Sequence, residues 1–149
     1  MYKHILISTD GSDVARKGVE HGLALAKAVG ARVTVVTVSE PFPFHASVAG
    51  AGWVPTADDV SGYEAAQKDY AGKVLAAAKA QADGAGVTAT TLHVPDAWPA
   101  EAIVDTAKTA GCDLIVMASH GRRGLGRLIL GSQAAEVLAH SAVPVLVVR

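Results

Sequence analysis

The chain has 149 residues, of which 50% are hydrophobic and 5% aromatic, so aliphatic side chains must fill its core. We expect a single domain over residues 1–149. Its net charge of −1 argues against nucleic-acid or anionic-membrane partners. A single cysteine, Cys112, excludes an internal disulfide and favours a reducing compartment. No signal peptide or run of about 20 apolar residues is evident, which predicts a cytoplasmic protein.

Strand-like and helix-like patterns alternate along the whole chain. Strands are predicted over Lys3–Ser8, Arg32–Val38, Val87–Val94, Asp113–Ala118 and Val145–Val148. Helices are predicted over Asp13–Val29, Tyr63–Ala82, Pro99–Gly111 and Gln133–His140, the last opened by Gly131 and Ser132. This alternation predicts an α/β fold, with a parallel sheet covered by helices on both faces and joined by right-handed crossovers.

Two segments depart from the regular pattern of strands and helices. Gly18 and Gly22 weaken the first helix, and we interpret them as points where it closely approaches the sheet. The segment Ser39–Val60 holds three prolines and no clear periodicity, which is typical of a lid or a binding loop.

The stretch from Asp113 to Ser132 carries the strongest functional signal. A buried strand leads into a loop, Ser119–Leu130, which is rich in glycine and arginine and ends at a helix N-terminus. Glycines let backbone N–H groups approach an anion, and a helix N-terminus adds unpaired donors and partial positive charge. We therefore predict the phosphate half of a nucleotide site.

Two common nucleotide signatures do not fit this loop. The glycines Gly124, Gly126 and Gly131 miss the G-x-G-x-x-G spacing of dinucleotide sites. Gly126 and Gly131 have the spacing of a Walker A loop, but Ser132 occupies the position of its lysine. Neither a hydrolase elbow nor a set of metal ligands at suitable spacing is present.

A third pattern fits. The segment from Met117 to Arg149, together with ILISTDGS near the N-terminus, resembles the universal stress protein family. Nucleotide-binding members carry G-x2-G-x9-G-[ST]; here Gly121, Gly131 and Ser132 supply its later positions, and Ala118 replaces the first glycine. The resemblance implies a three-layer α/β/α, adenine nucleotide alpha hydrolase-like (Rossmann-like) fold. It also implies a five-stranded parallel sheet in the order 3-2-1-4-5.

The resemblance also implies roles for individual residues. Asp10, with Ser8 and Thr9 beside it, would contact the adenine region, although Asp10 could equally cap the first helix. Val38 would meet the base through its backbone, and Met117 and Ala118 would lie along base and ribose. The phosphates would be held by Gly121, Gly131 and Ser132 with the N–H groups of Gln133 and Ala134, and Arg122 and Arg123 are further phosphate partners. His120 lies within the motif and is included among the binding residues, although a lone histidine in a loop is more often structural.

The implied ligand is ATP, ADP or AMP, with Mg²⁺ held only through the phosphates. The implied assembly is a homodimer through the edge strand Val145–Val148, whose short apolar run suits strand pairing between chains. We expect a stress-response module with slow or no turnover, and the Ser39–Val60 segment could report occupancy to a signalling partner. A nucleotide-free interaction protein and a slow ATPase are the alternatives.

Overall fold

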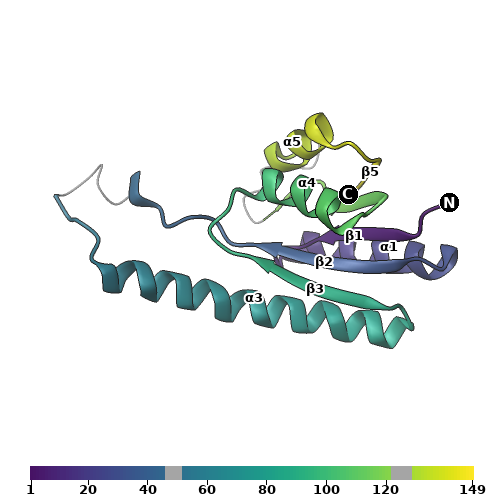
Figure 1. The fold of residues 1–149 in the computed structure, drawn as a ribbon, viewed down its shortest axis with the longest axis horizontal. Helices are drawn as coiled ribbons and strands as arrows, with labels where there is room; N and C mark the ends of the chain where they lie inside the picture. The colour runs from purple at the N-terminus through teal and green to yellow at the C-terminus, as the bar shows by residue number, and fades with distance from the viewer. Residues whose placement is uncertain (46–51, 122–128) are drawn as a thin grey trace.

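The computed structural model describes residues 1–45, 52–121 and 129–149, which form a three-layer α/β/α arrangement (Figure 1). Its strands are β1 (His4–Ser8), β2 (Arg32–Val38), β3 (Ala89–Val94), β4 (Leu114–Ala118) and β5 (Val145–Val148). Its helices are α1 (Asp13–Val29), α3 (Ala57–Ala85), α4 (Pro99–Ala110) and α5 (Ser132–His140). The strand order β3-β2-β1-β4-β5 confirms the predicted 3-2-1-4-5 sheet.

The sheet is parallel throughout, and its centre is fully enclosed. Ile5 of β1 pairs with Val33 of β2 on one side and with Leu114 of β4 on the other. Ile5, Leu6 and Ile7 are completely buried, as expected of a continuous apolar strand covered on both faces. Alternate residues of the strands enter two separate cores, one under α1 and α3 and the other under α4 and α5.

Helix α1 lies close to the sheet at its two glycines, as predicted. A Cβ atom at Gly22 would come within 2.5 Å of Ile7 Cδ1, and one at Gly18 within 3.1 Å of the backbone N of Ala118. Any larger side chain at these positions would therefore push the helix off β1 and β4.

The long helix α3 differs from its prediction. It begins at Ala57, six residues before the predicted Tyr63, and it ends at Ala85. A capping box starts it: Thr56 Oγ1 accepts from the N–H of Asp59, and the Asp59 carboxylate accepts from the N–H of Thr56. The C-terminal part of the predicted irregular segment Ser39–Val60 is therefore helical.

Strand β3 is shorter than predicted, because Gly86 and Val87 belong to the C-terminal cap of α3. Gly86 adopts a left-handed conformation with φ of 71°, and the N–H of Val87 donates to Ala82 O at 2.9 Å. The strand therefore starts at Ala89 and not at Val87. The remaining boundaries agree with the predictions to within one residue.

Candidate functional site

A cavity of about 390 Å³ opens at the carboxyl ends of β1, β2 and β4. The chain leaves β1 toward β2 on one side and later returns to β4 on its other side, so the cavity lies where the strand order reverses. Twelve predicted site residues line it: Ser8, Thr9, Asp10, Val38, Met117, Ala118, His120, Gly121, Gly131, Ser132, Gln133 and Ala134. The predicted phosphate partners Arg122 and Arg123 lie outside the described residues.

The turn after β1 is held by its own side chains. The N–H of Thr9 continues the sheet by donating to Val36 O, and Asp10 Oδ1 accepts from the N–H of Ser12 at 2.9 Å. Ser12 is the N-cap of α1, and its hydroxyl accepts from the N–H of Ala15. The interpretation of Asp10 as that cap is therefore wrong, since Asp10 orders the turn one step earlier.

Helix α3 closes over this turn. Tyr70 Oη donates to the backbone O of Asp10 at 2.8 Å. A Cβ atom at Gly11, whose φ is 80°, would lie 2.6 Å from Val74 Cγ2 and 2.7 Å from Tyr70 Oη. Only glycine allows both this backbone conformation and this contact, so the position of Asp10 depends on the packing of α3.

The end of β4 forms the cavity floor. Met117 and Ala118 are 5% and 8% exposed, and the N–H of Ser119 extends the pairing with β5 by donating to Val148 O at 2.7 Å. His120 Nδ1 lies 3.0 Å from Ser119 Oγ, within hydrogen-bonding distance. The chain therefore leaves the sheet in a fixed direction before it reaches Gly121.

The N-terminus of α5 borders the cavity without a side-chain cap. Its N-cap residue is Gly131, which offers no acceptor to the N–H groups of Ser132, Gln133 and Ala134. Among the other described helices, α1 and α3 are capped by Ser12 and Thr56. This helix end is therefore the place in the cavity best suited to an anion.

Two glycines allow close approaches between chain segments at this end of the cavity. The N–H of Gly131 donates to Ser119 O at 2.9 Å, and a Cβ atom there would lie only 2.7 Å from the same oxygen. A Cβ atom at Gly121 would lie 2.9 Å from Asp10 Oδ2. Asp10 after β1 and Gly121 after β4, far apart in sequence, thus meet across the cavity, as the strand order requires.

The side chain of Gln133 has a role that the sequence did not reveal. Its Oε1 accepts from the N–H of Ala100 at 3.1 Å, in the first turn of α4. The N-cap residue of α4, Trp98, makes no side-chain cap of its own. One residue therefore contributes its backbone to the start of α5 and its side chain to the start of α4.

The sequence interpretation also missed the α3 wall of the cavity. Tyr63, Gln67 and Tyr70 line it, and Tyr63 Oη donates to the backbone O of Glu40 at 3.1 Å. Their spacing of four and then three residues places them on one helix face. That spacing was a usable signal, but only once α3 was known to lie over the strand ends.

One titratable group lies just behind the cavity wall. His93 Nε2 lies 2.7 Å from Ser39 Oγ, and Ser39 itself lines the cavity. Burial, with the nearby charge of Lys68, lowers the pKa of His93. The neutral imidazole is therefore the favoured partner of Ser39 near pH 7.

The described residues lack two features that would indicate other kinds of site. No group of three or more histidine, cysteine, aspartate or glutamate side chains in residues 1–45, 52–121 and 129–149 could hold a metal ion. In the same part of the chain, none of the helices combines the length and apolar character needed to cross a membrane.

Comparisons with known proteins agree with this architecture. The profile of the "Universal stress protein family" matches residues 1–149. Universal stress protein MJ0531 of Methanocaldococcus jannaschii is 34% identical over 149 residues, covering 100% of this chain and 83% of that protein.

Two solved structures are similar over nearly the whole chain. The structure of protein MJ0577, from the same organism, has a TM-score of 0.83 at 27% identity and covers 99% of this chain and 96% of its own. A universal stress protein in complex with cAMP has a TM-score of 0.72 at 27% identity and covers 99% of this chain and 97% of its own.

Proposed function

Since the chain belongs to the universal stress protein family, we propose that its cavity binds an adenine nucleotide, namely ATP, ADP or AMP. The observation that carries this proposal is the uncapped N-terminus of α5, which borders the cavity next to Gly121. A phosphate there would accept hydrogen bonds from N–H groups to which the N-cap residue Gly131 offers no side-chain acceptor, and it would lie at the favourable end of the helix dipole.

The other end of the cavity suits a base and a sugar. Met117 and Ala118 supply apolar contact, Val38 offers backbone groups at the end of β2, and Asp10 supplies a carboxylate with Ser8 and Thr9 beside it. Tyr63 and Tyr70 of α3 add aromatic surface on the opposite wall. We assign the base to this end, and the phosphates to Gly121, Gly131 and the first turn of α5.

A relative supports the class of ligand. The universal stress protein solved with cAMP shares 27% of its aligned residues with this chain. A Mg²⁺ ion would enter with a triphosphate and be held through its oxygens, and the hydroxyl of Ser132 at the helix start could help to hold it.

We further propose that the protein is a cytoplasmic homodimer that acts through its bound state, with slow or no turnover. The dimer would form through β5, a four-residue edge strand with a partly exposed Leu146. Strand pairing across a two-fold axis would satisfy the outward backbone groups of this edge.

The test is native mass spectrometry of the purified protein, followed by calorimetric titration with ATP and AMP. We expect a co-purifying adenine nucleotide, or saturable binding, in the wild type and loss of both in Gly131→Val. An empty wild-type protein without measurable affinity for either nucleotide would refute the proposal and favour the nucleotide-free interaction protein. Steady-state phosphate release in the same samples separates the slow ATPase from the binding module.

A further inference from the structure

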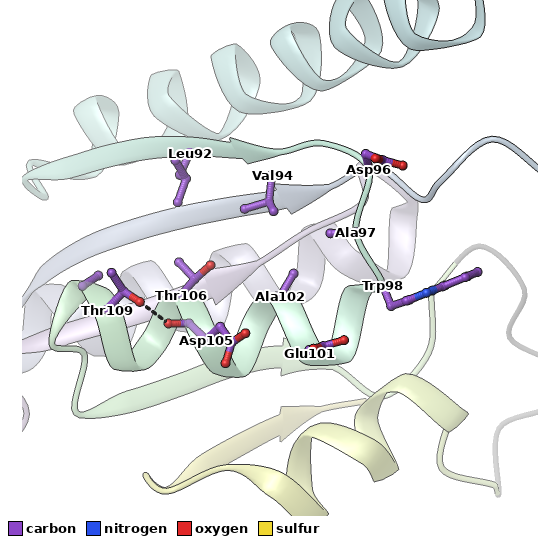
Figure 2. Close-up of a pocket in the computed structure, with 11 residues that line it drawn as sticks. Leu92, Val94, Asp96, Ala97, Trp98, Glu101, Ala102, Asp105, Thr106 and Thr109 are labelled. Atoms are coloured by element: carbon purple, nitrogen blue, oxygen red, sulfur yellow. Dashed lines mark hydrogen bonds between the residues drawn. The ribbon is translucent and has the colours of Figure 1, made fainter. Parts of the chain in front are cut away.

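A second hollow, of about 550 Å³, lies between β3 and α4 (Figure 2). Leu92 and Val94 point from β3 toward α4, and Trp98 stands at the end of the hollow where α4 begins. Its volume falls in the range of ordinary ligand pockets, yet it opens along one side as a groove. This groove shares no lining residue with the nucleotide cavity.

The groove exposes apolar surface that the fold does not cover. Helix α4 packs beside β2, and none of the helices in the described part of the chain lies above the same face of β3. Leu92 is 42% exposed and Trp98 is 62% exposed. Exposed apolar side chains of this size along one groove are typical of a surface that is covered in a complex.

The groove runs along a sheet edge whose backbone is available. The N–H of Val33 donates to Thr88 O and the N–H of Ser39 donates to Val94 O, so even-numbered residues of β3 face β2. In a parallel ladder the intervening residues, such as Thr91, then direct their N–H and C=O groups outward. The strand, ATTLHV, carries no proline or charged residue, the usual devices that block pairing at an edge.

The charge of the groove is of one sign. Asp96, Glu101 and Asp105 line it, and none of the described residues lining it is a lysine, arginine or histidine. Thr109 Oγ1 donates to the backbone O of Asp105 at 2.8 Å (Figure 2). The carboxylate of Asp105 takes no part in this hydrogen bond. A positively charged occupant is therefore favoured over a neutral or acidic one.

We propose that this groove binds an extended, basic segment of a partner protein, which adds to β3 as a sixth strand. Backbone pairing with the outward groups of Thr91 supplies the register. An aliphatic side chain of the segment covers Leu92, and lysine or arginine side chains reach Glu101 and Asp105. The binding does not depend on the nucleotide site.

The test uses fluorescence anisotropy with the fluorescein-labelled peptide Lys-Thr-Ile-Thr-Lys-Thr as probe, because alternate positions place both lysines and the isoleucine on one face of a strand. Glu-Thr-Ile-Thr-Glu-Thr is its acidic counterpart. We expect saturable binding of the basic peptide only. In the wild-type protein labelled with ¹⁵N, the amide resonance of Thr91 should shift on binding. Equal affinity for the two peptides, or no saturable binding of the basic one, would overturn the proposal.

Three variants separate the contributions of charge, apolar contact and backbone. The double substitution Glu101→Gln with Asp105→Asn should weaken binding about fivefold, as expected for two exposed ion pairs. Leu92→Lys should weaken it at least about tenfold, through lost apolar contact and added repulsion. Thr91→Pro removes an outward N–H and should abolish binding.

Matched controls carry the same changes outside the groove. Glu20→Gln changes a carboxylate on the exposed face of α1 and is the control for the charge variant. Val29→Lys replaces a side chain that is 39% exposed at the end of α1 and is the control for Leu92→Lys. Neither should alter binding. If Thr91→Pro does not fold, Leu92→Lys decides alone. Loss of binding in the charge variant but not in Leu92→Lys would mean non-specific attraction and overturn the proposal.

Sedimentation decides whether a second copy of the chain occupies the groove. We expect the mass of Leu92→Lys to equal that of the wild type. A wild-type oligomer that Leu92→Lys dissociates would assign the groove to self-association and refute a basic partner segment.

Discussion

The substitution Gly131→Ala tests whether the start of α5 holds the phosphates. Gly131 has φ of −61°, which alanine adopts without strain, so the added methyl group is the main perturbation. Its Cβ atom would lie 2.7 Å from Ser119 O, a backbone atom that cannot rotate away. The start of α5 must therefore move away from the end of β4.

The cost can be estimated for stability and for binding. Overpacking of this kind costs about 1–3 kcal/mol, or roughly 5 °C in melting temperature for a domain of this size. A displaced helix start also misaligns charge-assisted hydrogen bonds to phosphate, each worth about 1.5–3 kcal/mol, so ATP affinity should fall about tenfold to a hundredfold. Calorimetric titration and thermal melts measure the two effects separately.

Two control glycines make the result specific. Gly84, in α3, has open space where its Cβ would lie, so Gly84→Ala should stabilise the fold by about 0.5–1 kcal/mol and leave ATP affinity unchanged. Gly121→Ala would place its Cβ atom 2.9 Å from Asp10 Oδ2, a side-chain atom and not a backbone atom, and should cost less than Gly131→Ala. A folded Gly131→Ala protein that binds ATP within about twofold of wild type would refute the placement of phosphates at α5.

Three further predictions concern other contacts. Gln133→Ala removes the acceptor for the N–H of Ala100 and should lower the free energy of urea unfolding by about 1 kcal/mol. The backbone N–H of residue 133 remains in this variant, so a large loss of ATP affinity would contradict the proposal that Gln133 binds phosphate through its backbone. Leu146→Lys should convert dimers to monomers on a sizing column, whereas Val29→Lys should not; an unchanged elution volume would exclude the β5 interface. Burial lowers the pKa of His4, so its contribution to stability is complete above about pH 6.5 and falls as the pH drops below that value. In urea unfolding, the free energy of unfolding of His4→Gln should fall less steeply with decreasing pH than that of the wild type. An identical dependence on pH in the two proteins would refute this prediction.

Much of the fold could be predicted because each strand and most helices carry their own local signal. Continuous apolar runs such as Ile5–Ile7 indicated buried strands, and Gly30 indicated the end of α1, where it adopts φ of 71°. The N-terminal half of α3 lacks such a signal, because its side chains up to Tyr70 are not buried and therefore show no apolar stripe. Its start depended on the short capping box at Thr56 and Asp59.

The candidate site shows the same division. Residues at strand ends, such as Asp10 and Ala118, could be assigned because parallel strands direct their carboxyl ends to one edge. The contributions of Tyr70 and of the Gln133 side chain could not, because each contacts an element distant in sequence. Such contacts depend on how helices are placed over the sheet, which local patterns do not encode.

The two halves of α3 differ in how strongly they are packed against the rest of the molecule. Its buried residues, Ala71, Leu75, Ala78 and Ala82, all lie after Tyr70, and Figure 1 shows the earlier turns projecting past the strand ends. Those turns are held by contacts such as the hydrogen bond from Tyr63 Oη to Glu40 O and not by buried apolar side chains, so we expect them to open at lower cost than the rest of the helix. Because Tyr63 and Gln67 belong to them, we expect this wall of the cavity to be the first to open.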